Sequence, residues 1–465
     1  MLRSVTMHDH QATPTKRPWI SLALALSFCV VAFLTGCGDT SGSAKQSLSP
    51  AIEPIIFVHI SDTHFDTKTE TNSGLSGTVD LTQSGPALMS ALITQVIPVI
   101  RPIATVHTGD MVEKGYITET WQTYSNLLRT SMLTTYSAYV DIPGNHDVKV
   151  LDSTYNYADG LKDFILYSQT PTPTRYGYTT LDSPSGPVRL IRTNTADSTL
   201  NDYAMRNWEN IYGYFPDSQQ QALYSHPDRD QMVALTVVLG HSPVAESYLS
   251  TPEGYAPGTA IYKPGTTTYD KRYMYQITDG NERMKQLIET FKVPIYFCGH
   301  VHTPGLDWLG SKALVVTADT FGAHGTASTF NLVAYDPEAK SPAVKLIPID
   351  AANSPSVAWP IIIITAPANS TLAGTNPNAV DYSTASLPKL RAMVFSPSDT
   401  AAVKAATYVI DGGVKSGDLA VMPGGRVWEG QLNLQGLMPG THVVSVIATL
   451  DGGQTGSDDI TITVK

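Results

Sequence analysis

The chain has 465 residues, which is more than one hydrophobic core normally serves, so we expect two or three domains. Hydrophobic residues make up 42% and charged residues 15%, which excludes a wholly disordered chain. The formal net charge of −11 gives no support for the basic surface that nucleic-acid binding needs, so no nucleic-acid polymer is expected as a partner.

The amino-terminal segment has the pattern of an export signal. Basic residues precede a charge-free, mostly apolar run at residues 19–34, which is shorter than the ~20 residues of a typical membrane span. The run ends in Leu-Thr-Gly-Cys, which resembles a bacterial lipobox, the signal-peptidase motif whose cysteine receives lipid. We therefore predict a lipoprotein signal peptide over residues 1–36, lipid attachment at Cys37 and a flexible tether over residues 37–53. The protein would then be exported and anchored to a bacterial membrane, on the periplasmic or cell-surface side.

An ordinary secretory signal and an uncleaved anchor are the alternatives for the same segment. The chain has three cysteines. Cleavage would remove Cys29 and acylation would occupy Cys37, which leaves Cys298 as a thiol. An intrachain disulfide is then impossible, so the mature chain would depend on its hydrophobic core and on any bound metal.

The middle of the chain alternates strand-like and helix-like patterns. Short apolar runs predict strands at 54–60, 103–106, 138–142, 232–239 and 293–297. Helical spacing of apolar residues predicts helices at 84–100, 117–133 and 281–291. Repeated units of strand, polar loop and helix are typical of a layered α/β fold. Beyond residue 302 the helical pattern stops, and strands that close a second sheet are expected at 313–317, 331–335 and 344–347.

The composition changes near residues 349–356, and the rest of the chain predicts strands alone. They are expected at 361–365, 391–395, 407–410, 427–432, 442–449 and 460–464. Short strands at this spacing, without helices, are typical of an immunoglobulin-like or fibronectin-type β-sandwich. We therefore predict an α/β domain over residues 54–350, a linker over 351–358 and an Ig-like sandwich over 359–465, whose protein or glycan partner is unknown. We also expect a chain that ends near Asp350 to fold and act without the sandwich.

Polar motifs directly follow five of the predicted strands. They are Asp62-Thr63-His64, Gly109-Asp110, Gly144-Asn145-His146-Asp147, Gly240-His241 and Gly299-His300-Val301-His302. Because α/β sheets place their sites at the carboxyl ends of strands, we expect these motifs to meet. Carboxylate, amide and imidazole groups are the ligands of Mn²⁺, Fe, Co²⁺ or Zn²⁺ in octahedral-like sites. The ligands outnumber what one ion can take, so the sequence predicts two divalent metal ions.

These five blocks, in this order over roughly residues 55–347, closely resemble the calcineurin-like metallophosphoesterase superfamily. The resemblance implies two packed β-sheets flanked by helices, and hydrolysis of P–O bonds by a metal-bridging hydroxide. The implied ligands are Asp62, His64 and His302 for one metal, Asn145, His241 and His300 for the other, and Asp110 as the bridge.

The resemblance also implies a catalytic role for His146, next to the ligand Asn145. In the family this histidine contacts phosphate and protonates the leaving group, and a carboxylate three residues past the bridging aspartate orients it. That carboxylate is Glu113 here, at a position where Asp is also common. The alternative for Glu113 is an acid that interacts with a helix dipole. Two residues stay open: Asp147, as support for the site or as a turn acid, and His324, as a pocket residue.

The charges of the implied site suit a phosphoester substrate. Two divalent ions with Asp62, Asp110 and hydroxide leave a small positive charge, which matches a phosphodiester monoanion and also accepts a monoester. The segment His241-Ser242-Pro243 resembles diesterase and purple-phosphatase branches, so we expect diesters to be slightly favoured. The leading hypothesis is an exported, lipid-anchored phosphoesterase that acts on small phosphoesters. The alternative is a surface-binding lipoprotein that uses the Ig-like domain and whose metal site is mainly structural.

Overall fold

The computed structural model describes residues 53–66, 81–131, 133–148, 157–196, 213–244, 276–310, 313–322, 328–349, 356–397 and 402–465. The predicted signal peptide, Cys37 and His324 lie outside these described residues. The segment Pro50–Lys465 forms one compact unit. Among the described helices, none is long and apolar enough to cross a membrane.

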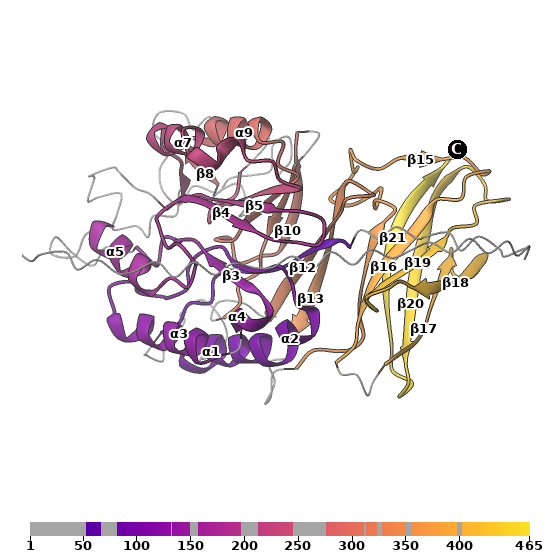
Figure 1. Cartoon of the computed structure of the whole chain (residues 1–465), viewed down its shortest axis with the longest axis horizontal. Helices are drawn as coiled ribbons and strands as arrows, with labels where there is room; N and C mark the ends of the chain where they lie inside the picture. Colours follow the sequence, from indigo (N-terminus) through magenta and orange to yellow (C-terminus); the bar gives the residue numbers. More distant parts are fainter. Residues whose placement is uncertain are drawn as a thin grey trace, which may run out of the picture. The chain divides into compact units, whose positions relative to one another are not determined.

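Two mixed β-sheets form the first part of this unit (Figure 1). The first sheet, in the order β13-β12-β1-β2-β3, contains β1 (Ile55–Ile60), β2 (Ala104–His107), β3 (Ala138–Asp141), β12 (Ser328–Asp336) and β13 (Ser341–Ile349). The second sheet, in the order β10-β11-β9-β7-β5-β4, contains β4 (Gly177–Leu181), β5 (Val188–Arg192), β7 (Leu235–Leu239), β9 (Ile295–Cys298), β10 (Gly305–Leu309) and β11 (Ala313–Thr317). β1, β2 and β3 are parallel to one another, as are β5, β7, β9 and β11, so the carboxyl ends of each set lie along one edge.

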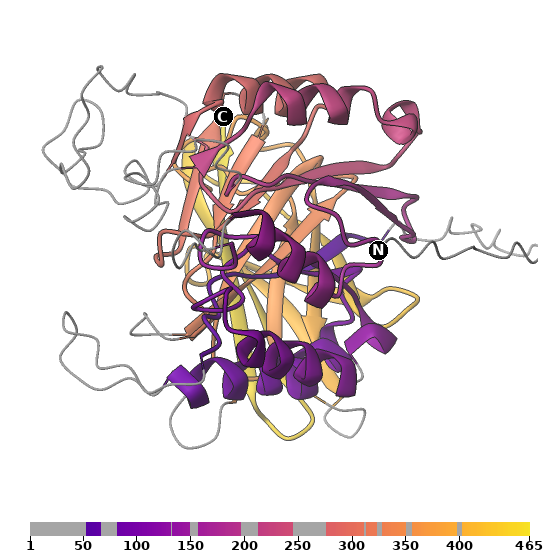
Figure 2. The same ribbon diagram turned by 90° about the vertical axis from the view of Figure 1, so that its left-hand side faces the viewer.

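Helices cover the outer face of each sheet (Figures 1 and 2). On the first sheet lie α1 (Leu81–Ala91), a π-helical turn (Leu92–Val96), α2 (Ile97–Ile100), α3 (Thr118–Thr130), α4 (Leu133–Tyr136) and α5 (Tyr157–Tyr167). On the second lie α7 (Asp217–Tyr224) and α9 (Asn281–Thr290), near a 3₁₀ turn (Pro227–Asp230) and a strand pair of β6 (Gly213–Tyr214) and β8 (Ile277–Asp279). Alternation along β1 explains this layering. Ile56 and Val58 join the helix-side core, whereas Ile55 and Phe57 pack between the two sheets.

The rest of the chain is all β. Its strands, in the order β14-β16-β19-β18-β17-β20-β21-β15, are β14 (Ile361–Ala366), β15 (Asp381–Tyr382), β16 (Lys389–Phe395), β17 (Val403–Ile410), β18 (Lys415–Val421), β19 (Val427–Gln431), β20 (Gly440–Leu450) and β21 (Thr455–Val464). β18 pairs with β17 through its first part and with β19 through Ala420 and Val421, so it passes between two groups of strands that share one apolar core. The predicted architecture, an α/β domain followed by an all-β region, is confirmed. Its immunoglobulin type stays a prediction.

The all-β region shares a core with the α/β part. Ile361 and Phe395 belong to the same buried apolar cluster as residues of α1 and α2. Arg391 of β16 is fully buried and lies 2.6 Å from a carboxylate oxygen of Asp336, at the end of β12. The expectation that a chain ending near Asp350 folds alone stays a prediction. Truncation there would expose this apolar surface and leave Asp336 without its cation. The domain limits themselves stay a prediction.

Candidate metal centre

The loops that follow β1, β2, β7 and β9 are held together by main-chain hydrogen bonds. The N–H of Asp62 donates to the carbonyl of Gly109 at 3.0 Å, and the N–H of Gly299 donates to the carbonyl of His241 at 2.9 Å. Each loop therefore fixes the next, and the polar side chains that they carry converge at one edge of the molecule. All seven residues expected as metal ligands meet there.

One group of side chains gathers around His64. Its Nε2 lies 3.1 Å from Nε2 of His302 and 3.9 Å from Oδ2 of Asp110. Nε2 of His302 is in turn 3.3 Å from Oδ1 of Asp62. The four ligand atoms lie within 4.8 Å of one another, a spacing that a single cation can span.

A second group gathers around His241. Its Nε2 lies 2.9 Å from Oδ1 of Asn145, 3.1 Å from Nδ1 of His300 and 3.3 Å from Oδ2 of Asp110. The ring is oriented by its other nitrogen, because Nδ1–H donates to the carbonyl of Thr108 at 2.7 Å. The same Asp110 oxygen thus belongs to both groups, which is the geometry that a bridging ligand requires.

The two carboxylates at the centre fit a bound cation. Each has one oxygen held by a main-chain N–H: Asp62 Oδ2 accepts from His300 at 3.0 Å, and Asp110 Oδ1 accepts from His146 at 2.8 Å. The other oxygens, Asp62 Oδ1 and Asp110 Oδ2, are buried and have no hydrogen-bond donor among the described residues. A buried carboxylate oxygen in that state is costly unless a cation compensates it. The donor set of oxygen and imidazole nitrogen is also the one that divalent transition metals take.

The electrostatics of the cluster favour positive charge at its centre. Burial opposes ionisation of Asp62, but His302 and His64 outweigh it and hold the pKa of the carboxyl well below its usual range. Burial likewise opposes a charge on His241, yet the carboxylates of Asp110 and Asp62 raise its pKa to about 9. A cation and protons would therefore compete for the same imidazoles.

Backbone strain is concentrated in these loops. Five of the expected ligands have a left-handed backbone, with φ values of 55° at Asp62, 44° at His64, 55° at Asp110, 72° at His300 and 52° at His302. Such a conformation costs of order 1–3 kcal/mol for a residue other than glycine, and it persists only where the surroundings enforce it. Its clustering on the ligands themselves is typical of a functional site.

Two glycines make the close packing of the ligands feasible. Gly109 has a φ of 105°, and a Cβ there would lie 2.6 Å from Nδ1 of His241. A Cβ at Gly144 would collide with the carboxylate of Asp110. These positions explain why glycine precedes the aspartate and the asparagine of the two motifs.

Asp147, whose role the sequence left open, supports the bridging ligand. Its carboxylate accepts the main-chain N–H groups of Asp110 at 2.9 Å, Val112 at 3.1 Å and Gly144 at 2.8 Å. It thereby ties the loop after β2 to the loop after β3. This side chain is a structural brace of the site, and its position two residues past Asn145 was the one signal of that role.

His146 and Glu113 lie beside the first group. Nδ1 of His146 donates to the main-chain carbonyl of Glu113 at 2.9 Å and is 3.5 Å from its carboxylate. The nearer partner of that carboxylate is Nδ1 of His64, at 2.8 Å. Glu113 thus contacts the predicted proton donor, but its side chain serves a predicted metal ligand more closely, which the sequence pattern did not indicate.

Two further histidines brace the loops without facing the cluster. Nε2 of His59 lies 3.0 Å from the hydroxyl of Thr108, and Nε2 of His107 lies 3.0 Å from the hydroxyl of Thr63. Both rings are fully buried, and burial lowers the pKa of each to about 3. They are therefore neutral structural residues.

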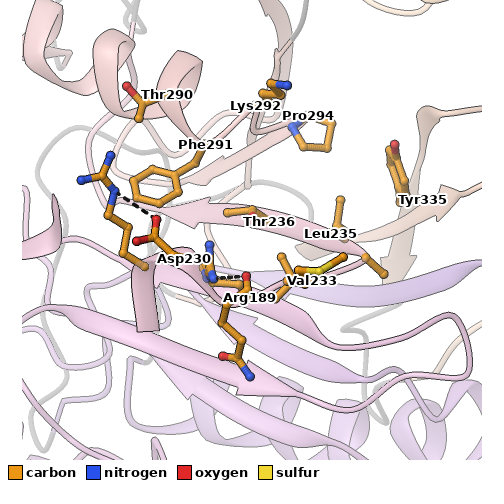
Figure 3. A pocket seen from close by; sticks show the side chains of 14 residues that line it. Arg189, Asp230, Val233, Leu235, Thr236, Thr290, Phe291, Lys292, Pro294 and Tyr335 are labelled. Carbon is orange, nitrogen blue, oxygen red and sulfur yellow. Dashed lines mark hydrogen bonds and ion pairs between the residues drawn. The ribbon is translucent and has the colours of Figure 1, made fainter. Parts of the chain in front are cut away.

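A cavity of about 510 Å³ lies elsewhere, next to the segments that enter β7 and β9 (Figure 3). The metal cluster follows the opposite ends of these strands. Two of the cavity's charged side chains already have partners: Arg189 donates to the carbonyl of Gln231 at 2.6 Å, and Arg229 lies 3.8 Å from Asp230. We therefore assign the chemistry to the ligand cluster rather than to this cavity.

Comparison with known proteins agrees with this geometry. The family described as Calcineurin-like phosphoesterase matches residues 55–304, which is more than half of the chain and includes all seven expected ligands. No curated protein matches the chain. Among solved structures, a dimetal phosphatase from Danio rerio is 14% identical, with 63% of this chain and 96% of that one covered and a TM-score of 0.39. Purple acid phosphatase PPD1 from yellow lupin seeds is 13% identical, with 67% of this chain and 54% of that one covered and a TM-score of 0.38. A 5′-nucleotidase from Candida albicans is 13% identical, with 63% of this chain and 50% of that one covered and a TM-score of 0.36.

Proposed function

The chain belongs to the calcineurin-like phosphoesterase family, and we propose that it is an exported, lipid-anchored hydrolase of small phosphoesters. Family membership and the clustered ligands support a metal-dependent phosphoesterase. The observation that carries the proposal is Asp110 Oδ2, a buried oxygen without a hydrogen-bond donor that lies in both ligand groups. Mn, Fe, Co and Zn are all compatible with these ligands.

The ligands divide the work at the site. Two divalent cations held there would lower the pKa of a water molecule and balance the negative charge of the phosphoryl group. Asp110 would offer an oxygen to both ligand groups. Asn145 supplies a carbonyl oxygen without adding charge, so positive charge remains available to the substrate.

We propose His146 as the proton donor. Its Nδ1–H is engaged by the carbonyl of Glu113 at 2.9 Å, so Nε2 is the atom that can hold a proton and deliver it to a leaving alkoxide. Its main-chain N–H also fixes Asp110 Oδ1, at 2.8 Å. His146 would therefore deliver the proton through its ring and position Asp110 through its main chain.

Metal content and turnover, measured on the full chain in detergent, test this function. We expect two divalent ions per chain and hydrolysis of bis(p-nitrophenyl) phosphate, with kcat/KM slightly above that for p-nitrophenyl phosphate. The assay should be repeated with Mn²⁺, Fe²⁺, Co²⁺ and Zn²⁺ to identify the metal. A chain that holds both metals but hydrolyses neither ester would favour the surface-binding lipoprotein. The complete ligand set, together with His146, weighs against that alternative.

Membrane attachment is a separate part of the proposal and rests on the sequence at residues 34–37. We expect Cys37→Ala to abolish lipid labelling and to release the protein from membranes. Two acyl chains or more would be needed for stable anchoring by lipid alone. Unchanged attachment of the variant would indicate an uncleaved amino-terminal anchor instead.

A further inference from the structure

We propose that Glu113 is a positioning residue for the metal ligand His64, and that it sets the metal affinity of one of the two ligand groups. The affected group is Asp62, His64, Asp110 and His302. The inference rests on the metal-dependent function proposed above and deepens it. It assigns the carboxylate of Glu113 a different primary partner from His146.

The contacts of Glu113 separate its side chain from its main chain. Its carboxylate Oε2 lies 2.8 Å from Nδ1 of His64, whereas Oε1 is 3.5 Å from Nδ1 of His146. The nearer acceptor for His146 is the main-chain carbonyl of Glu113, at 2.9 Å. Removal of the side chain would therefore take the charged partner from Nδ1 of His64 but leave the closer acceptor of His146 in place.

The main chain holds this carboxylate in position. The loops that carry His64 and Glu113 run side by side: the N–H of His64 donates to the carbonyl of Asp110 at 3.0 Å, and the N–H of Glu113 donates to the carbonyl of Phe65 at 3.0 Å. Both interacting side chains are almost fully buried, with exposures of 0% for His64 and 8% for Glu113. Glu113 is thus a fixed part of the site rather than a mobile surface acid.

A carboxylate at this place selects the form of the imidazole that binds metal. The Glu113 carboxylate, 2.8 Å from Nδ1, favours a proton on that nitrogen, which puts the lone pair on Nε2, the nitrogen that faces His302 at 3.1 Å. Such partners of ligating histidines orient the ring and increase its basicity, and their loss typically lowers metal affinity about 10–100-fold.

The second ligand group uses a different acceptor for the same purpose. Nδ1–H of His241 donates to the carbonyl of Thr108, which is neutral, at 2.7 Å. His64 alone of these two ligands has a charged acceptor. A change at Glu113 should therefore weaken one metal position and leave the other as it was.

Titration of the metal-free full chain with Mn²⁺, measured by calorimetry, tests the inference. Wild type should bind two Mn²⁺. Glu113→Ala should weaken one binding step about 10–100-fold and leave the other unchanged. Glu113→Gln, which keeps an acceptor but not the charge, should restore part of that loss. The matched control is Glu119→Ala, an exposed acid in the first turn of α3, and it should bind Mn²⁺ as wild type does. His146→Gln should also keep both affinities.

Other outcomes would overturn the inference in distinguishable ways. If Glu113→Ala keeps both Mn²⁺ affinities and slows only alkyl phosphodiesters, the carboxylate acts through His146. If wild type binds three Mn²⁺ and Glu113→Ala binds two, then Glu113, His64 and His146 form a metal site of their own, as their spacing within 4.8 Å allows. If circular dichroism shows that Glu113→Ala does not fold, the Mn²⁺ titration of Glu113→Gln decides. Two Mn²⁺ affinities equal to those of wild type would then contradict the role of the charge. A wild-type chain that binds no Mn²⁺, Fe²⁺, Co²⁺ or Zn²⁺ would refute the proposed function itself before any variant is compared.

Discussion

Two clusters of buried charge lie in this chain, and they differ in whether the protein balances them. In the interface between β12 and the all-β region, both oxygens of Asp336 have donors: Nη1 of Arg391 at 2.6 and 2.8 Å, the hydroxyl of Thr365 at 2.8 Å and the N–H of Glu338 at 2.9 Å. In the metal centre, Asp62 and Asp110 each keep one buried oxygen without a donor. Both carboxylate oxygens of Asp336 thus have donors once the chain folds, whereas Asp62 and Asp110 each leave an oxygen to which a cation from solution can bind.

The backbone differs in the same way. Asp336 and Arg391 lie in the regular strands β12 and β16, where their side chains meet without unusual main-chain geometry. The ligands Asp62 and Asp110 instead have φ values of 55° in loops. Folding therefore accepts backbone strain and buried carboxylate oxygens without donors at the metal centre, and neither at the Asp336 carboxylate. This difference distinguishes a functional site from a structural one more sharply than burial does.

Replacement of Asp110 should have the largest effect, because it breaks the unbalanced cluster at its shared oxygen. We expect Asp110→Asn to lose about one metal ion or more per chain and to reduce phosphodiester turnover to background, since two cations would then lack a common anion. The fold should survive, because an asparagine oxygen can still accept the N–H of His146. Metal analysis and kcat/KM on the same preparation measure this. A variant with both metals and full turnover would rule out the bridging role.

Replacement of His146 should separate a catalytic metal centre from a structural one. A leaving alkoxide needs a proton as the P–O bond breaks, whereas p-nitrophenolate leaves without help. General acid catalysis is typically worth ~10²–10⁴-fold in rate. We therefore expect His146→Gln to slow alkyl phosphodiesters by about this factor and nitrophenyl esters far less, with both metals retained.

The comparison of the two substrate types also defines what would contradict this role. Equal losses in kcat/KM on alkyl and nitrophenyl esters would mean that His146 holds the phosphoryl group rather than delivering a proton. Loss of a metal ion would mean that it supports the cluster. In either case the two ligand groups would stand, but the proton donor would have to be sought elsewhere.

The site was far more predictable from the sequence than the interface. Each expected ligand lies two to four residues past the end of a strand. Parallel strands bring their carboxyl ends together, so the order of the motifs along the chain predicted which residues lie close in space. Asp336 and Arg391 carry no such signal, because 55 residues separate two ordinary charged positions of two strands. Their pairing depends on how two sheets pack, which local patterns do not encode.

The missed strands have a similar cause. No strand is predicted at β18, because Leu419 alone is buried there among exposed and half-buried neighbours and the alternation is too weak to recognise. The pair β4 and β5 lies between the predicted strands at 138–142 and 232–239, where the sequence pattern predicts no strand. The preference of Glu113 for His64 over His146 was also beyond prediction, because loop spacing brings both rings near and side-chain geometry alone chooses between them.

Replacement of Arg391 in the cluster with Asp336 should lower the stability of the fold and leave the catalytic activity unchanged. We expect Arg391→Met to lower the free energy of unfolding by ~3–5 kcal/mol, because Asp336 would remain buried without its partner. Most of this loss should return in Asp336→Asn/Arg391→Met, which removes both charges. Urea unfolding of the full chain measures the stabilities, and kcat/KM should stay at the wild-type value at temperatures where the variant is folded. Lost turnover in a folded variant would show that the all-β region shapes the metal centre.

A third charged site, the pair of His442 and Asp411, should contribute least to stability, because both side chains are partly exposed to water. Nδ1 of His442 lies 2.6 Å from the carboxylate of Asp411, and the two side chains are 11% and 34% exposed. The hydrogen bond that Nδ1–H donates to Asp411 raises the pKa of His442 above its ordinary value of 6.5. A raised pKa in the folded state means that protonated His442 stabilises the fold fully below about pH 6.5, and that this contribution disappears as pH rises through the folded pKa. Solvent screening keeps the effect near 0.2–1 kcal/mol, the range of exposed pairs. Urea midpoints from pH 5 to 9 should therefore fall slightly more steeply for wild type than for His442→Gln, and identical pH slopes would show that the pair contributes nothing measurable. The size of the mutational effect at the three charged sites would then depend on one variable, the extent to which each charge must be balanced by something other than water.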